Sequence, residues 1–387
     1  MSLCKFYSSK KLIWEPLEGE ERLSDWRGLA MNEEIFRKRV KRFQEELKKR
    51  DIDGAVIRTL SSFIYFTGTK WLRPSLLIPA EGEPKVLVVR NEAEEFKRRS
   101  WIEDVEEYQR VEDLMAHIVS WIRNNGMERV GLEFGFERDA YLAFLRIFQR
   151  LNPTVDVVDI LDITMGLRMI KDEWELEQIR KAGKIAKAGM KVAEEVIKPG
   201  KSELEIAAEI TRELMIKGSE NPKVYVSTTP RAHAEPFRDL KVKENGVVTV
   251  VIGADYNHYH ANMARTFVIG DPGERVREAI KAKEEAYRLA LDETRIGVPL
   301  NSVEKKLAEF FRAKGFGNEY ITGYTHGVGL LIEELPMPTI IVQTRAQKVQ
   351  ENMVLSIIHA PLMLPEGSIK HEDTYIVKKD KLESVTS

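Results

Sequence analysis

Histidines crowd the C-terminal part of this 387-residue chain. Six of the seven lie after residue 232, namely His233, His258, His260, His326, His359 and His371, while the first 232 residues contain only His117. Imidazole serves as a general acid or base near neutral pH and as a ligand for divalent metal ions. The crowding therefore predicts a site of proton transfer or metal binding in the C-terminal part.

Three polar residues follow one another at strand spacing. In a strand expected from 256 to 267, His258, His260 and Asn262 are two residues apart, so they project from one face. Such a face lines a pocket or faces solvent, and the spacing leaves both alternatives open.

Two later segments add candidate residues. His326 lies within Thr-His-Gly-Val-Gly-Leu (325–330), where the glycines let the backbone approach the imidazole closely. Lys-His-Glu-Asp-Thr (370–374) opens a strand in which Glu372 and Thr374 share a face. His326 and Glu372 are candidate catalytic residues, and Lys370 is a candidate pocket residue. The structural alternatives are a hydrogen-bonded histidine and a surface ion pair.

The elements that would position these residues fall into two parts. Before residue 160, helical patterns (32–50, 111–125, 138–150) alternate with β-rich runs (54–57, 75–78, 85–89, 129–132, 155–160). This alternation predicts an α/β domain with a mixed sheet. The turn signal Glu-Gly-Glu-Pro at 81–84 predicts one antiparallel pair.

After residue 165 the pattern changes to an α+β arrangement. A long charged helix (171–197) precedes a helix that starts at Ser202, where Glu205 completes a capping box. Further helices are expected at 275–295 and 302–314, and strands at 246–252, 256–267, 353–358 and 374–377. The predicted organisation is an N-terminal arm at 1–31, an α/β domain at 32–165 and an α+β domain at 166–387.

The charge balance argues against a polyanionic partner. The 60 Lys and Arg residues balance 62 Asp and Glu, so there is no net field to recruit nucleic acid or an anionic membrane. Apolar runs are too short to span a bilayer, and the single Cys4 forms no intramolecular disulfide. We predict a cytoplasmic protein with no nucleic-acid or membrane partner, and we interpret the first residues as a surface arm and not a signal peptide.

Together, the C-terminal segments resemble the prolidase, aminopeptidase P and creatinase family, in the same order along the chain. The resemblance covers 161–379, and the preceding region is similar to the creatinase-type N-terminal domain. It implies an α/β creatinase-like domain followed by an α+β pita-bread domain. It also implies a homodimer and, in catalytic members, two divalent metal ions held by five side chains.

Three of those five positions differ from the family pattern. The family's two aspartates fall on Val251 and Asn262, eleven residues apart as the motif requires, and one glutamate falls on Ile358. His326 and Glu372 match the remaining two ligands. Outside the ligand set, a histidine that the family uses for substrate binding or proton transfer matches His233, and a second such histidine falls on Glu333. The pocket residues expected around this site are His258, His260, Glu333, His359 and Lys370.

The replaced ligand positions change the metal content that we expect. Two neighbouring cations repel each other and need anionic oxygens between them, yet Glu372 alone remains of the four carboxylates in the family pattern. We therefore expect no metal cofactor, with a single divalent ion at His326 and Glu372 as the alternative. Xaa-Pro dipeptidase activity of the two-metal type is expected to be absent.

Three functions remain open. The first is a non-catalytic relative that keeps a peptide-binding cleft. The second is a creatinase-like, metal-free hydrolase for a small amidine-like ligand, with His233 as general base or acid. The third is a peptidase with a rebuilt single-metal site that adds His260, His359 or Asn262 to His326 and Glu372. For His359, an ideal strand predicts a side chain pointing away from that site.

Overall fold

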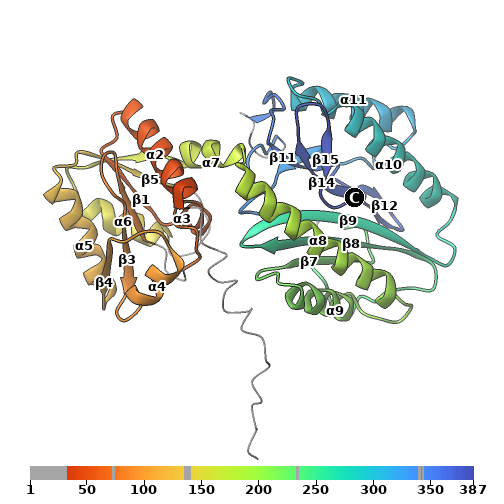
Figure 1. The fold of residues 1–387 in the computed structure, drawn as a ribbon. Helices are drawn as coiled ribbons and strands as arrows, with labels where there is room; N and C mark the ends of the chain where they lie inside the picture. The colour runs from red at the N-terminus through yellow and green to blue at the C-terminus, as the bar shows by residue number, and fades with distance from the viewer. Residues whose placement is uncertain (1–32, 72–74, 135–140, 232–234, 339–340, 342–343) are drawn as a thin grey trace, which may run out of the picture.

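The computed structural model describes residues 33–71, 75–134, 141–231, 235–338, 341 and 344–387. They form an N-terminal and a C-terminal part that lie side by side, joined by helix α7 (Leu161–Met169) (Figure 1). The predicted arm and His233 lie outside the described residues. Helix α7 spans the predicted boundary at residue 165, which stays a prediction.

The N-terminal part is built on a six-stranded sheet. Its strands are β1 (Gly54–Ile57), β2 (Leu76–Pro79), β3 (Lys85–Val89), β4 (Val105–Tyr108), β5 (Arg129–Leu132) and β6 (Asp156–Asp159). Its helices are α2 (Glu33–Lys49), α3 (Leu60–Thr67), α4 (Ala93–Arg99), α5 (Val111–Asn124) and α6 (Tyr141–Leu151). Strand β1 pairs antiparallel with β2 and parallel with β5, and β2 pairs antiparallel with β3. The predicted mixed sheet and its antiparallel turn are confirmed.

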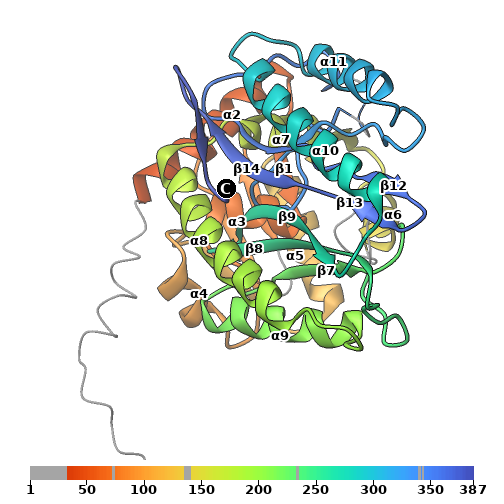
Figure 2. The ribbon, with the colours of Figure 1, turned by 90° about the vertical axis from the view of Figure 1, so that its right-hand side faces the viewer.

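The C-terminal part places helices on both faces of a curved sheet (Figure 2). Its strands are β7 (Lys223–Ser227), β8 (Gly246–Tyr256), β9 (Tyr259–Ile269), β10 (Thr325–Gly327), β11 (Val354–Ile357), β14 (Glu372–Val377) and β15 (Leu382–Ser384). Strands β12 (Leu362–Leu364) and β13 (Gly367–Ile369) form a separate pair. Helices α8 (Glu173–Val196) and α9 (Glu203–Ile216) pack on one face, and α10 (Glu274–Glu293) and α11 (Leu300–Ala313) cover the other. The predicted α+β class is confirmed.

Two helix starts in this part follow from local chemistry. The Ser202 backbone N–H donates to Glu205 Oε2 at 2.8 Å, and the Glu205 N–H donates to Ser202 Oγ at 3.3 Å, as the capping box predicted. Asp172 and Glu175 form the same arrangement at the start of α8. These carboxylates satisfy N–H groups that have no partner within the helix.

The β8–β9 turn corrects one strand prediction. Asn257 and His258 both have positive φ angles, 47° and 67°, so they form the turn of a tight hairpin. Strand β9 therefore begins at Tyr259, and His258 does not share a strand face with His260 and Asn262. None of the helices in the described part of the chain combines the length and apolarity needed to cross a membrane.

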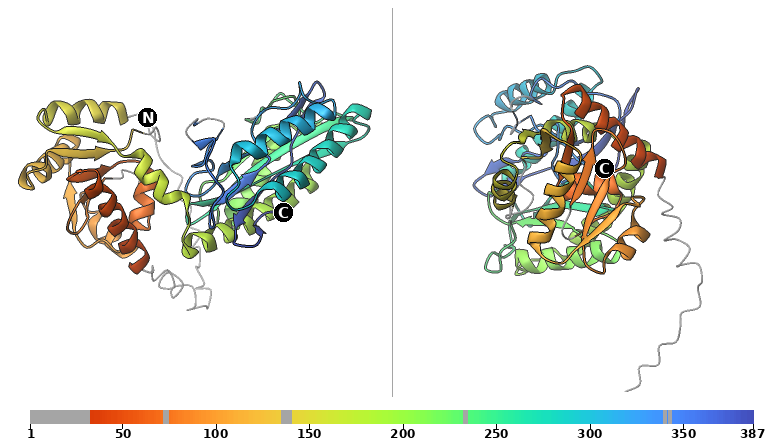
Figure 3. Two further views of the ribbon diagram at one scale, coloured as in Figure 1. Left: turned by 90° about the horizontal axis from the view of Figure 1, so that it is seen from above. Right: turned by 90° about the vertical axis from the view of Figure 1, so that its left-hand side faces the viewer.

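One apolar core runs through both parts of the molecule. It includes Phe36 of α2 and Phe66 of α3 together with Tyr259 and Val328 from the C-terminal part. The ring of Trp174 in α8 packs edge-on against Phe36, with centroids 5.5 Å apart, and against Tyr259 at 5.6 Å. Aromatic rings thus contribute to the contact between the two parts, which Figure 3 shows from above.

A buried arginine lies within this contact. Arg39 of α2 is 2% exposed and donates to Asp172 Oδ2 through Nε at 3.0 Å and Nη2 at 2.7 Å. Its Nη2 also lies 3.4 Å from Glu175 Oε2, and Nη1 donates to the Tyr65 carbonyl at 3.0 Å. The guanidinium thus connects α2 with the start of α8.

Replacing Arg39 by Met should destabilise the protein by about 3–5 kcal/mol, because Asp172 and Glu175 lose their buried cation. The neighbouring Lys38, paired with Glu34 at the surface, provides the matched control: Lys38→Met should cost less than about 1 kcal/mol. Urea unfolding followed by tryptophan fluorescence measures both. Equal midpoints for the two variants would contradict the assigned role.

A second buried ion group links α3 and α7 with the loop after β10. Glu334 is 2% exposed; Arg168 Nη2 donates to its Oε2 at 2.5 Å and Lys171 Nζ to its Oε1 at 2.8 Å. Arg168 also donates to Ser61 Oγ at 2.7 Å. Burial opposes ionisation of Glu334, but Lys171 and Arg168 outweigh it and lower the pKa to about 2.

This depressed pKa makes stability depend on pH. A carboxyl whose pKa falls on folding stabilises the native state above its unfolded pKa, and this stabilisation is lost as the pH falls toward the native value. Glu334→Gln should cost about 3–5 kcal/mol at pH 7, and its deficit against the wild type should shrink by about 1 kcal/mol at about pH 3.5. Urea unfolding at both pH values measures this. The exposed Glu366→Gln is the control, and a pH-independent deficit would refute the assignment.

Candidate metal centre

Strand register collects most of the predicted ligand positions on one face. Val251 of β8 lies opposite Ala264 of β9, which lies opposite Glu372 of β14. Asn262 is two residues from Ala264, so its side chain points the same way. Further along, Ser356 of β11 lies opposite both Thr374 and His326. The side chains of Val251, Asn262, His326 and Glu372 therefore share one face of the sheet.

His326 is held in a defined tautomer. Its Nδ1 lies 2.9 Å from the carbonyl of Gly327, which can only accept, so Nδ1 carries a proton and Nε2 is the nitrogen left to bind a metal ion. A methyl group at Gly327 would collide with the Leu335 backbone, and one at Gly329 with the Glu334 carboxylate. The two glycines thus let the loop that follows β10 pack closely against this segment.

His359 faces His326, contrary to the expectation from strand alternation. Strand β11 ends at Ile357, and Ile358 has a φ of 54°, a left-handed conformation that β-branched residues seldom adopt. This residue breaks the alternation of side chains. The rings of His359 and His326 consequently meet edge to face, with centroids 4.7 Å apart.

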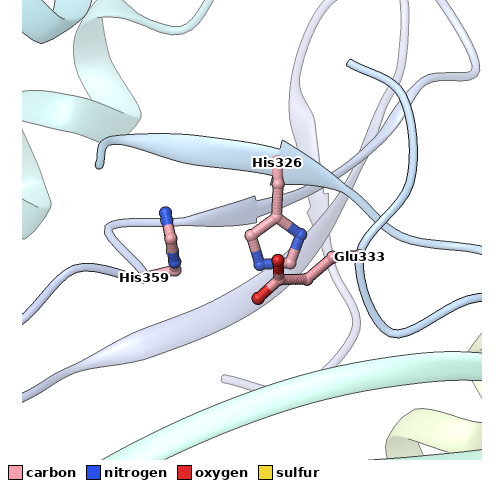
Figure 4. Close-up of side chains that lie close together, drawn as sticks. All are labelled: His326, Glu333 and His359. Atoms are coloured by element: carbon pink, nitrogen blue, oxygen red, sulfur yellow. The ribbon is translucent and has the colours of Figure 1, made fainter. Parts of the chain in front are cut away.

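Glu333 completes a group of three side chains whose ligand atoms lie close together. The ligand atoms of His326, Glu333 and His359 all lie within 4.8 Å of one another, and Figure 4 shows the Glu333 carboxylate beside the His326 ring. Ligand atoms of a tetrahedral zinc ion are about 3.4 Å apart, so a small movement of the half-buried Glu333 would close the site. The expectation of no metal cofactor is wrong, because these residues fit a divalent ion.

Glu372 lies next to this group and forms an ion pair with Lys370. Its Oε1 is 3.8 Å from His326 Nε2 and accepts a hydrogen bond from Ser356 Oγ. Its Oε2 is 2.9 Å from Lys370 Nζ. Burial opposes ionisation, yet Lys370, followed by the two histidines, lowers the pKa of Glu372 to about 2. The pairing of His326 with Glu372 as metal ligands stays a prediction, and Glu333 adds a second carboxylate near His326.

The other pocket candidates lie in different surroundings. His260 is buried, with Nδ1 3.3 Å from the Gly329 carbonyl, and burial lowers its pKa. His258 lines a separate cavity of about 590 Å³ with Trp71 and Trp174. Asn262 Nδ2 donates to the Ile332 carbonyl at 2.7 Å, while its Oδ1 has no hydrogen-bond partner among the described residues. The catalytic roles of His233, His326 and Glu372 stay predictions.

Comparison with known proteins agrees with this architecture. The family description "Metallopeptidase family M24" matches residues 177–379, and "Creatinase/Prolidase N-terminal domain" matches 39–170. An Xaa-Pro dipeptidase of Pyrococcus horikoshii is 26% identical over 361 residues, which cover 91% of this chain and 98% of that protein. A probable dipeptidase PepE of Mycobacterium tuberculosis is 27% identical over 327 residues, covering 81% and 83%.

Solved structures have the same fold. The prolidase from Pyrococcus horikoshii OT3 gives a TM-score of 0.81 at 24% identity, covering 90% of this chain and 98% of that chain. The X-Pro aminopeptidase from Thermotoga maritima gives 0.76 at 23% identity, covering 87% and 96%. A creatinase-type domain followed by a pita-bread domain is thereby confirmed, and the metallopeptidase match also counts against the expected lack of a metal. The chain belongs to the prolidase and aminopeptidase P family of metallopeptidases.

Proposed function

We propose that this chain is a prolidase-like, peptide-binding protein that holds one divalent metal ion between His326, Glu333 and His359. In this proposal it lacks the two-metal Xaa-Pro hydrolysis implied by the family pattern. The observation that carries it is the group of three ligands, found beside family ligand positions occupied by Val251 and Ile358.

The charge of the site favours one ion over two. Glu333 and Glu372 supply two negative charges, and Lys370 already neutralises one of them. Two divalent ions would therefore leave about three positive charges in a largely buried site. Such uncompensated burial costs several kcal/mol per ion. Aliphatic Val251 and Ile358 add no lone pair.

The donor set favours zinc. Two imidazoles and one carboxylate are a ligand set of zinc hydrolases, whereas magnesium and manganese prefer oxygen ligands. The Gly327 carbonyl fixes the tautomer that leaves His326 Nε2 available as a ligand. When bound, such an ion would polarise the carbonyl group of a peptide.

Xaa-Pro dipeptides are the first ligands to test, since relatives that align over most of this chain carry the name Xaa-Pro dipeptidase. Binding would place a peptide on the sheet face that carries Val251, Asn262 and His326. The predicted homodimer and cytoplasmic location belong to the same proposal. Light scattering and cell fractionation test them.

A second candidate function is hydrolysis by the single ion. The observation that favours it is again the donor set, because two histidines and a glutamate around zinc leave one position open for a substrate. The creatinase-like alternative rests on His233, which lies outside the described residues.

The one-ion site predicts the metal content. Protein purified without chelator and dialysed against zinc should hold about one equivalent per chain. His326→Ala and His359→Ala should each lower zinc affinity at least about tenfold, because each removes one of three ligands. His117→Ala, in the N-terminal part, should leave it unchanged. Elemental analysis and calorimetry measure this, and two equivalents in the wild type would reject the proposal.

The lost ligands predict the activity. Cleavage of Xaa-Pro dipeptides should be at least about 10³-fold slower in kcat/KM than for the prolidase of Pyrococcus horikoshii, since two ions are not available to activate water and hold the carbonyl. The triple variant Val251→Asp, Asn262→Asp, Ile358→Glu should gain a second equivalent of metal. Rapid metal-dependent cleavage by the unchanged protein would instead favour the single-ion hydrolase.

A further inference from the structure

A buried lysine neutralises the carboxylate that the candidate metal centre does not use. Lys370 and Glu372 are 3% and 2% exposed, and Lys370 Nζ lies 2.9 Å from Glu372 Oε2. The contact is an ion pair without the alignment of a hydrogen bond. Oε2 therefore has an electrostatic partner but accepts no hydrogen bond from the residues that the structure describes.

The other oxygen of Glu372 is also engaged. Ser356 Oγ donates to Oε1, which lies 3.8 Å from His326 Nε2. Glu372 is thus near enough to the metal centre to act as a ligand after a small side-chain rotation. What distinguishes it from Glu333 is the ammonium group beside it.

A second buried lysine lies on this side of the site. Lys283 of α10 is 1% exposed, and its Nζ donates to the carbonyl of Ala360, the residue after His359. Burial, followed by the charge of Lys370, lowers the pKa of Lys283 to about 7, so Lys283 adds only part of a positive charge near neutral pH. The charge that a second divalent ion would meet is therefore mainly that of Lys370.

We propose, on the basis of the single-metal function above, that Lys370 is a resident cation that keeps Glu372 out of the metal's coordination shell and so limits the site to one ion. The ammonium group takes over part of the charge that a second metal ion would supply. Lys370 is accordingly a positioning residue that sets metal stoichiometry, and it does not itself contact the ion.

The test uses full-length protein titrated with zinc chloride by calorimetry, with folding followed by circular dichroism. Four proteins are compared: the wild type, Lys370→Met, Lys370→Arg and the double variant Lys370→Met/Glu372→Gln. The double variant is the matched control, because it removes both charges together and leaves no unpaired ion in the interior.

The expected results differ for each protein. Lys370→Met frees Glu372, so it should bind a second equivalent of zinc or bind the first at least about tenfold more tightly. Lys370→Arg keeps the charge and should behave as the wild type. The double variant should bind one equivalent with a Kd within about threefold of the wild type.

Two outcomes overturn the inference. The first is Lys370→Met with unchanged stoichiometry and Kd, and the second is loss of zinc by the double variant, which would make Glu372 a ligand. A Lys370→Met variant that folds only when zinc is present supports the inference. If Lys370→Met does not fold under any condition, the zinc affinity of the double variant decides whether Glu372 is a ligand. If the wild type binds no zinc but Lys370→Met does, the one-ion function is rejected and the role of Lys370 is retained. If neither protein binds zinc, the one-ion function and the role of Lys370 are both rejected.

Discussion

The geometry of the candidate site depends on the pairing of buried charges, above all that of Glu334 with Arg168 and Lys171. A buried carboxylate without cations would cost several kcal/mol, so this group fixes the loop that follows β10 against α3 and α7. Glu333 is the neighbour of Glu334 in that loop. The Glu333 carboxylate lies beside His326 because the ion pairs of Glu334 with Arg168 and Lys171 fix the position of this loop.

Two of the three proposed metal ligands lie outside the strands. In the family pattern implied by the sequence, carboxylates on the strands hold the metal, and here two of those positions carry aliphatic side chains at Val251 and Ile358. The proposed ligands lie on β10 (His326), in the loop after β10 (Glu333) and in the turn after β11 (His359). In this proposed site two of the three ligand atoms are imidazole nitrogens, which favours zinc over magnesium or manganese.

The sequence predicted regular elements well where patterns are local. Strands β1, β3 and β5 follow from short β-rich runs, and the start of α9 follows from the Ser202 capping box, each within a few residues. Helix α3 was missed because its side chains are buried almost all round, which leaves no polar face to mark a helix.

The candidate site was predictable in part. Motif order indicated His326 and Glu372, but the orientation of His359 depends on a left-handed backbone at Ile358 that no propensity favours. The contribution of Glu333 depends on ion pairs between residues more than 160 positions apart, which local patterns do not encode. The available sequence signal for Glu333 was that a carboxylate stands where the family has its second histidine.

The aromatic core shared by the two parts has a consequence for cooperativity. Trp174 touches Phe36 on one side and Tyr259, the first residue of β9, on the other. Opening the N-terminal part would therefore expose the base of the strand that carries Asn262. The two parts should unfold in a single cooperative transition. Metal binding at the candidate centre should therefore also stabilise α2 against unfolding.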